Sequence, residues 1–266
     1  MSKGKIYLVG LPIGNYGDLA PRAKEYITTA KNIVIEREEA FEHVWKRLGI
    51  TRPNVNIIPI EYDSDGGEPG FAYELENSNK ILELLENGED VYIVSDEGMP
   101  GIADPGEFIV RAAIKRGIEI TATPGPSVVI AAVSVAGCMH NFLFDAFLPY
   151  EEEEIEKFIS SRRSVHVPIV IVLRNLRRNP SGFGPAIFHD EIPKFLEKAE
   201  NILGKDRQAV LCYNLTTNNE RVIRGTLEYL RKYFEETPRD ESQITIVIDS
   251  HNGPLWRIYN DTLKQD

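Results

Sequence analysis

The chain has few cysteines and a shortage of positive charge. Only Cys138 and Cys212 occur among 266 residues, so the sequence indicates neither a disulfide framework nor a zinc site, and we predict no metal. Lysine and arginine total 30 against 41 aspartate and glutamate residues, which gives a formal net charge of −11. Proteins that hold nucleic acid by charge alone usually carry a basic face. The excess of acidic residues argues against non-specific nucleic-acid binding, but it does not exclude a local basic patch.

Long apolar runs, targeting signals and dinucleotide fingerprints are missing from the sequence. No run approaches the roughly 20 apolar residues that span a bilayer. The opening MSKGKIYLVG is too short and too strand-like for a signal peptide. There is no GxGxxG motif and no internal repeat. Hydrophobic content of 42% is ordinary for a globular protein, and we expect a cytoplasmic protein without membrane contacts.

The first half of the chain alternates between strand and helix patterns. One predicted helix has Asp18 as its N-cap and Pro21 in its first turn, and the next carries an apolar stripe that includes Phe41 and Trp45. The segment 63–78 is rich in Gly, Glu and Asp and is expected to be a loop before a helix over 79–88. The predicted strands are 6–10, 32–36, 54–62, 90–95 and 119–123. This alternation predicts a largely parallel sheet covered by helices.

The second half is less regular but also mixes strands and helices. The pattern predicts a domain boundary between residues 123 and 124, so that 1–123 and 124–266 are separate α/β domains. Its expected elements are a strand over 142–149, a charged helix over 151–163, a strand over 167–175, a helix over 192–203 and the segments 208–215, 220–234 and 243–250.

Glycine and proline are concentrated in three turns of the first half. They are VGLPIGN (9–15), SDEGMPGIADPG (95–106) and PGPS (124–127), and each directly follows a predicted strand. Glycine lets the backbone approach a ligand closely, proline fixes the turn, and a following helix presents unpaired N–H groups. The three turns together predict a small-molecule pocket at the carboxyl ends of the strands.

These segments resemble those of the tetrapyrrole methylase superfamily. Residues 11–15 match its Thr-Pro-Ile-Gly-Asn opening, residues 95–106 match its Ser-Asp-Ala-Gly-Thr-Pro-Gly-Ile-Ser-Asp-Pro-Gly loop with three changes, and its Pro-Gly-Pro-Ser turn is intact. The register continues through FLFDAFLP (142–149) and ITIVID (244–249). The chain is most similar to the ribosomal RNA small subunit methyltransferase I branch, which methylates a cytidine 2′-hydroxyl.

The resemblance implies a two-domain α/β fold, each domain a mostly parallel or mixed sheet flanked by helices, with S-adenosylmethionine (SAM) in the cleft between the domains. It also implies a SAM-dependent methyltransferase, a homodimer and, as partner, ribosomal RNA or the small ribosomal subunit. By the same resemblance the cofactor-binding residues are Pro12, Ile13, Gly98, Met99, Gly101, Ile102, Ser127, Val128, Leu173, Leu215 and Ile244. SAM needs backbone hydrogen bonds and an apolar adenine slot, which such loops can supply.

The segments that face the substrate in the family differ here. The family's Glu-Asp-Thr-Arg corresponds to residues 36–39, and Glu39 occupies the position of its arginine. The family's Glu-Ser-Pro-His-Arg corresponds to residues 174–178, and Arg174 occupies the position of its glutamate. Either the two residues form a swapped ion pair, or both are solvated. The catalytic candidates are Glu36, Glu39 and Arg178, with Glu38 and Asp63 as further carboxylates; Arg174 and Arg177 are the candidates for binding substrate phosphate or carboxylate.

These differences leave the methyl acceptor open. The leading hypothesis is a methyltransferase acting on ribosomal RNA. The alternatives are a methyltransferase with a small-molecule or protein acceptor, and a SAM-binding protein that no longer methylates.

Overall fold

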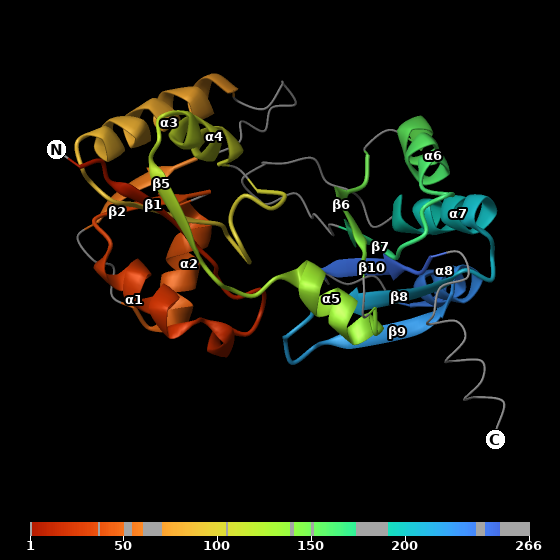
Figure 1. The fold of residues 1–266 in the computed structure, drawn as a ribbon. Coiled ribbons are helices and arrows are strands. Elements are labelled where there is room, and N and C mark those ends of the chain that lie inside the picture. Colours follow the sequence, from red (N-terminus) through yellow and green to blue (C-terminus); the bar gives the residue numbers. More distant parts are fainter. Residues whose placement is uncertain are drawn as a thin grey trace. The chain divides into compact units, whose positions relative to one another are not determined.

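The computed structural model of the protein describes residues 2–36, 38–50, 55–60, 71–104, 106–138, 141–149, 152–173, 191–237 and 243–250. These described residues divide into two compact units, unit 1 up to Ser127 and unit 2 from Val128 onwards (Figure 1). Each unit has its own five-stranded sheet flanked by helices, which confirms the predicted α/β fold class. A domain boundary between residues 123 and 124 stays a prediction.

Unit 1 contains a parallel sheet with the strand order β3-β2-β4-β1-β5. The central strand β1 pairs in parallel with β4 on one side and with β5 on the other, so that Val9 lies opposite both Val94 and Thr123. The strands are β1 (Lys5–Val9), β2 (Asn32–Ile35), β3 (Asn56–Pro59), β4 (Val91–Val94) and β5 (Glu119–Thr123). The carboxyl ends of β4, β1 and β5 therefore lie side by side at one edge of the sheet.

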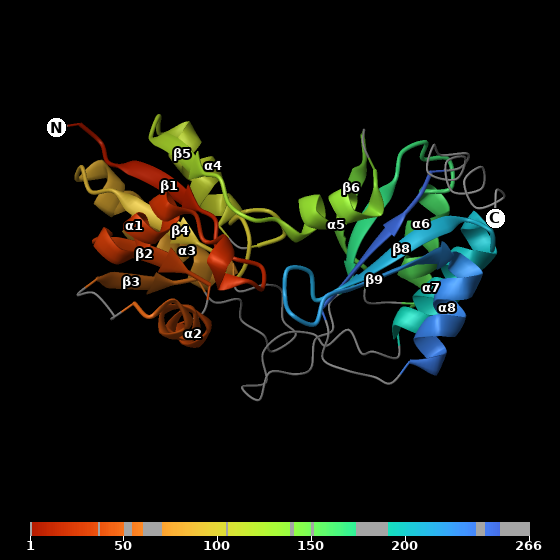
Figure 2. The same ribbon diagram turned by 90° about the horizontal axis from the view of Figure 1, so that it is seen from below.

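Helices cover both faces of this sheet (Figures 1 and 2). They are α1 (Pro21–Thr29), α2 (Glu38–Leu48), α3 (Phe71–Glu86) and α4 (Glu107–Lys115). In β2, Val34 packs in the core beneath α3 and α4, whereas Ile33 and Ile35 pack against α1 and α2. Burial of both faces explains why the parallel strands are continuous apolar runs.

Two sequence predictions in unit 1 are wrong. Helix α1 has Ala20 as its N-cap, without a side-chain cap; Asp18 belongs to the short turn Tyr16–Asp18, which is capped by Asn15. Helix α3 begins at Phe71 instead of residue 79. The Gly- and Asp-rich composition of the predicted loop comes mostly from residues 63–70, whereas Ala, Glu and Leu after Phe71 favour a helix.

Unit 2 contains a mixed sheet with the order β6-β7-β10-β8-β9. β6 runs parallel to β7, β10 runs antiparallel to both β7 and β8, and β9 pairs antiparallel with β8. The strands are β6 (Leu143–Phe147), β7 (Ile169–Leu173), β8 (Gln208–Tyr213), β9 (Arg221–Thr226) and β10 (Ile244–Ile248).

One helix packs on one face of this sheet and three pack on the other (Figure 1). The single helix is α5 (Val128–Ala136); the other three are α6 (Glu152–Ser161), α7 (Glu191–Leu203) and α8 (Leu227–Glu236). Ile246 of β10 belongs to the core under α6–α8, and Val247 to the core under α5, as alternation along a strand requires. The core under α5 also contains Cys138 and Cys212. In the described part of the chain no helix is long and apolar enough to cross a membrane.

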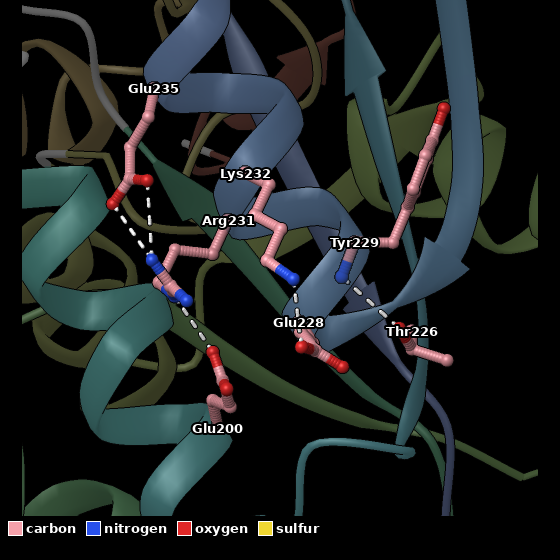
Figure 3. Close-up of polar contacts among 7 residues, drawn as sticks. All are labelled: Glu200, Thr226, Glu228, Tyr229, Arg231, Lys232 and Glu235. Carbon is pink, nitrogen blue, oxygen red and sulfur yellow. Dashed lines mark hydrogen bonds and ion pairs between the residues drawn. The ribbon is translucent and has the colours of Figure 1, made fainter.

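Polar contacts fasten α8 to its neighbours (Figure 3). At its start, the Thr226 hydroxyl accepts the Tyr229 N–H at 3.1 Å, an N-cap bond. Further along, the Arg231 guanidinium donates to Glu200 of α7 at 2.7 Å and to Glu235 at 3.0 Å. The cap marks where β9 ends and α8 begins, the Arg231–Glu200 pair links α8 to α7, and the Arg231–Glu235 pair lies within α8.

Candidate functional site

The three glycine- and proline-rich loops predicted from the sequence meet at the carboxyl edge of the unit 1 sheet. Leu11, after β1, and Gly98, after β4, exchange two backbone hydrogen bonds of 2.8 and 3.2 Å. The buried Ser95 hydroxyl lies 3.0 Å from the Glu97 carbonyl oxygen and 3.3 Å from that of Gly98. The Leu11–Gly98 bonds join the first two loops, and the Ser95 bonds hold the second loop internally.

The first and third loops touch through their backbones at Gly10 and Gly125. A Cβ atom built on Gly125 would lie 2.6 Å from the Cα of Gly10, and one built on Gly10 would lie 2.7 Å from the Cα of Gly125. Real Cβ atoms do not come so close to another backbone, so both positions require glycine. Both glycines lie in the motifs 9–15 and 124–127, but nothing in the sequence pattern distinguishes them from the other glycines there.

The predicted cofactor residues of unit 1 all lie on these loops. Pro12 and Ile13 are buried, Met99 and Ser127 are half-buried, and 52% of Ile102 is exposed. Gly98 and Gly101 have φ values of +78° and +82°, a region that side chains other than glycine rarely adopt. The arrangement offers backbone polar groups beside apolar side chains.

The predicted cofactor residues of unit 2 lie at one end of its sheet, except for Val128, which begins α5. Leu173, the last residue of β7, pairs with Ile244, the first residue of β10. Ile244 also pairs with Tyr213, the last residue of β8, and Leu215 follows two residues later. Leu173, Leu215 and Ile244 are all buried.

Glu36 occupies a carboxyl-rich position at the end of β2. Its Oε2 atom accepts the backbone N–H of Asp96, which follows the neighbouring strand β4, at 3.3 Å. Burial, and then the negative charges of Asp96 and Asp104, raise the pKa of Glu36 to about 8. Glu36 is a predicted catalytic residue; Asp96 and Asp104, which lie in the 95–106 loop, are not among the predicted site residues.

Among the other predicted catalytic and substrate residues, the structure describes the side chain of Glu38, which is exposed at the start of α2. Glu39 lies in α2, but its side chain is outside the described part of the structure. Asp63, Arg174, Arg177 and Arg178 also lie outside the described residues. The swapped ion pair between Glu39 and Arg174 therefore stays a prediction.

The described residues of unit 1 fit the requirements of SAM. The loop backbones pack closely at Gly10 and Gly125, and the Met99 sulfur lies 2.6 Å from the position that a Cβ of Gly10 would take. The exposed Ile102 offers apolar surface, and the turn at Gly101 presents main-chain groups of the kind that bind a nucleoside without a phosphate loop, whereas Gly98 holds the loop through its bonds to Leu11.

Comparison with known proteins identifies the family. The model of the tetrapyrrole (corrin/porphyrin) methylases matches residues 5–231. The chain belongs to the tetrapyrrole methylase family. Membership confirms the enzyme class expected from the sequence, a SAM-dependent methyltransferase.

Several relatives of this family member share most of its length. The ribosomal RNA small subunit methyltransferase I of Xylella fastidiosa (strain Temecula1) is 33% identical, over 90% of this chain and 78% of its own. Proteins of the same name from Synechocystis and Escherichia coli O157:H7 are 29% and 28% identical, over 91% and 99% of this chain and 78% and 84% of their own.

Solved structures share the tetrapyrrole methylase fold at lower sequence identity. The methyltransferase CobJ matches with a TM-score of 0.63 and 17% identity, covering 93% of this chain and 94% of its own. A diphthine synthase matches with a TM-score of 0.62 and 20% identity, covering 93% and 92%. At these identities the likeness concerns the fold alone.

Proposed function

We propose that this methyltransferase transfers a methyl group to the 2′-hydroxyl of a cytidine in small-subunit ribosomal RNA. The choice of ribosomal RNA as the methyl acceptor is supported by the 33% identity to a ribosomal RNA small subunit methyltransferase I over 90% of the chain. We include in the proposal that the protein is cytoplasmic, as its composition leads us to expect, and a homodimer, as the family resemblance implies.

In the proposed site, the loops after β1, β4 and β5 hold SAM, which supplies an electrophilic methyl group when bound. Pro12, Ile13, Met99 and Ile102 would contribute apolar contacts, and the turn at Gly101 would contribute backbone groups. Gly98, whose N–H and carbonyl both bond to Leu11, would hold the loop beside the cofactor. Residues Ser127, Val128, Leu173, Leu215 and Ile244 complete the proposed set.

Glu36 is the proposed general base. A ribose hydroxyl becomes a better nucleophile as its proton is removed, and an ionised carboxylate can accept that proton. A pKa of about 8 makes Glu36 a stronger base than an ordinary carboxylate, at the cost of being mostly protonated at neutral pH. Glu39 and Arg178 stay catalytic candidates, and Arg174 and Arg177 are proposed to bind backbone phosphates of the RNA.

The acceptor is tested by transfer of tritium from methyl-labelled SAM. Small ribosomal subunits, free small-subunit RNA, ribosomal proteins and a metabolite extract are incubated separately with the protein. Label in the RNA that is recovered as 2′-O-methylcytidine after nuclease digestion supports the proposal. Label confined to protein or metabolites assigns the enzyme a different acceptor, and SAM binding without any transfer favours a protein that has lost catalysis.

The base is tested by the pH dependence of the same reaction. The wild-type rate should rise about tenfold per pH unit below pH 8 and then level off, if Glu36 must be ionised. Glu36→Gln should lose this limb along with most of the activity. Glu42→Gln, which changes an exposed glutamate on α2, is the control and should keep the wild-type profile. A Glu36→Gln variant with normal activity would remove Glu36 from the mechanism.

A further inference from the structure

The turn that follows β8 has an unusual backbone. Asn214 and Thr216 have φ values of +46° and +69°, and they flank Leu215, which is 5% exposed. Among the described residues only Ala103 also has a positive φ without being glycine. For a β-branched residue such as Thr216 this conformation is a genuine outlier, so the surrounding structure must hold it in place.

The first half of the turn is fixed to the neighbouring strand. The Asn214 N–H donates to the Gln243 carbonyl, and the Asn214 side-chain oxygen accepts the Gln243 N–H, both at 2.9 Å. Gln243 directly precedes β10. Asparagine tolerates the left-handed conformation, so residue 214 is held without great strain.

The second half of the turn depends on Glu220. Its Oε2 atom accepts the Thr216 N–H at 2.7 Å, a short bond to a carboxylate of the kind that is stronger than a bond between neutral groups. The Glu220 N–H in turn donates to the Thr217 carbonyl at 3.1 Å, and the Thr217 N–H donates to that of Asn214 at 3.1 Å. Residues 214–220 therefore form a closed set of hydrogen bonds in which Glu220 is the charged member.

We infer that Glu220 is a positioning residue of the cofactor site: its carboxylate holds Thr216 in the left-handed conformation and thereby fixes the main chain of Leu215. Asn214 and Thr216, one left-handed residue on each side, determine where the N–H and carbonyl groups of Leu215 lie. This inference rests on the proposed function, in which Leu215 contacts SAM. Glu220, an exposed residue, would then affect the affinity for SAM without contacting SAM.

Calorimetric titration with SAM and S-adenosylhomocysteine tests the inference on four variants of the full chain. Glu220→Ala should weaken SAM binding about tenfold, because the charge-assisted bond that holds the turn is lost. Glu220→Gln keeps an acceptor and should lose less. Glu228→Ala removes an equally negative side chain from α8 of the same unit, where it pairs with Lys232, and should bind like the wild type (Figure 3).

The double variant Glu220→Ala/Thr216→Gly separates positioning from a loss of stability. Glycine adopts a positive φ without strain, so it should recover most of the affinity that Glu220→Ala loses. Thermal unfolding of each variant is measured alongside, and the affinity loss should persist at temperatures where Glu220→Ala is fully folded. Wild-type affinity in Glu220→Ala, or no recovery in the double variant, would overturn the inference alone. A wild-type protein that binds no SAM would overturn the proposed function as well.

Discussion

A carboxyl group with a pKa near 8 makes the stability of the folded protein depend on pH. Glu36 has an ordinary pKa of 4.5 when exposed, and burial beside Asp96 and Asp104 raises it to about 8 in the fold. Between these values the folded state binds more protons than the unfolded state. The stabilising effect of the bound proton is complete below about pH 4.5 and is lost as the pH rises through the folded pKa.

We therefore expect Glu36→Gln, which mimics the protonated acid, to gain stability relative to the wild type as the pH rises from 5 to 8. The difference in unfolding free energy at pH 8 should be at least about 1 kcal/mol, because one pKa unit corresponds to about 1.4 kcal/mol. Urea unfolding followed by circular dichroism at several pH values measures it. Glu107→Gln, a change at an exposed residue paired with Arg111, should show no such trend. Parallel curves for all three proteins would contradict the prediction.

Two glycines of the loops should respond differently to substitution by alanine. A Cβ on Gly101 meets no atom within 4 Å, so Gly101→Ala adds only the strain of its +82° φ, about 1–2 kcal/mol. Gly125→Ala must push the Gly10 backbone away and should cost more than about 3 kcal/mol. Urea unfolding gives both values, and a smaller loss in Gly125→Ala than in Gly101→Ala would contradict the close packing.

The same series tests the cofactor role of Gly101. Gly117→Ala is a matched control, because Gly117 follows α4 with a φ of +66° and also has nothing within 4 Å of its Cβ position. Both variants should lose similar stability, but only Gly101→Ala should weaken SAM binding in calorimetry. Equal binding by the two variants would indicate that the 95–106 loop is a structural turn.

Among the elements, α7 and α8 are joined by an ion pair that is mostly shielded from solvent. The side chains of Arg231 and Glu200 are 23% and 17% exposed, whereas those of Lys232 and Glu228 are 55% and 37% exposed. A double-mutant cycle to alanine should give a coupling energy of about 0.5–1 kcal/mol for the first pair and less than about 0.5 kcal/mol for the second. Urea unfolding of the single and double variants measures both. Equal coupling energies would mean that shielding from solvent does not strengthen the Arg231–Glu200 pair.

Element prediction from the sequence succeeded where periodicity was strong and failed where two elements adjoin. The five strands of unit 1 were predicted from their apolar runs. The sequence pattern does not divide the segment 220–234, which forms β9 up to Thr226 and α8 from Leu227. Only the cap at Thr226 separates them, and a capping threonine is hard to distinguish from a strand threonine in a sequence.

The site was predictable in its loops and not in its carboxylates. Glycine and proline mark loops locally, so the turns after β1, β4 and β5 could be identified from composition. The contact between Glu36 and Asp96 exists because β2 lies beside β4, with β3 outside both. Strand order arises from packing over the whole sheet, and no local pattern reveals it.

For the whole molecule, a net charge of −11 restricts how RNA could bind. If Arg174, Arg177 and Arg178 contact three phosphates, the logarithm of affinity for single-stranded RNA should fall against the logarithm of salt with a slope of roughly −2. Replacing all three by alanine should flatten this slope and leave SAM affinity unchanged. The matched triple variant Arg111→Ala/Lys115→Ala/Arg116→Ala removes the same charge from unit 1 and should keep the slope. Equal slopes in both triple variants would disprove the arginine contacts.

Both cysteines of the chain lie in the core under α5 of unit 2, and this gives the protein a built-in chemical reporter. Burial raises the pKa of Cys138 to about 11 and that of Cys212 to about 12, so hardly any thiolate forms at neutral pH while unit 2 is folded. Alkylating reagents should label these thiols only during transient opening. A pulse of iodoacetamide followed by mass spectrometry would then time the opening of unit 2 separately from that of unit 1, without any engineered label.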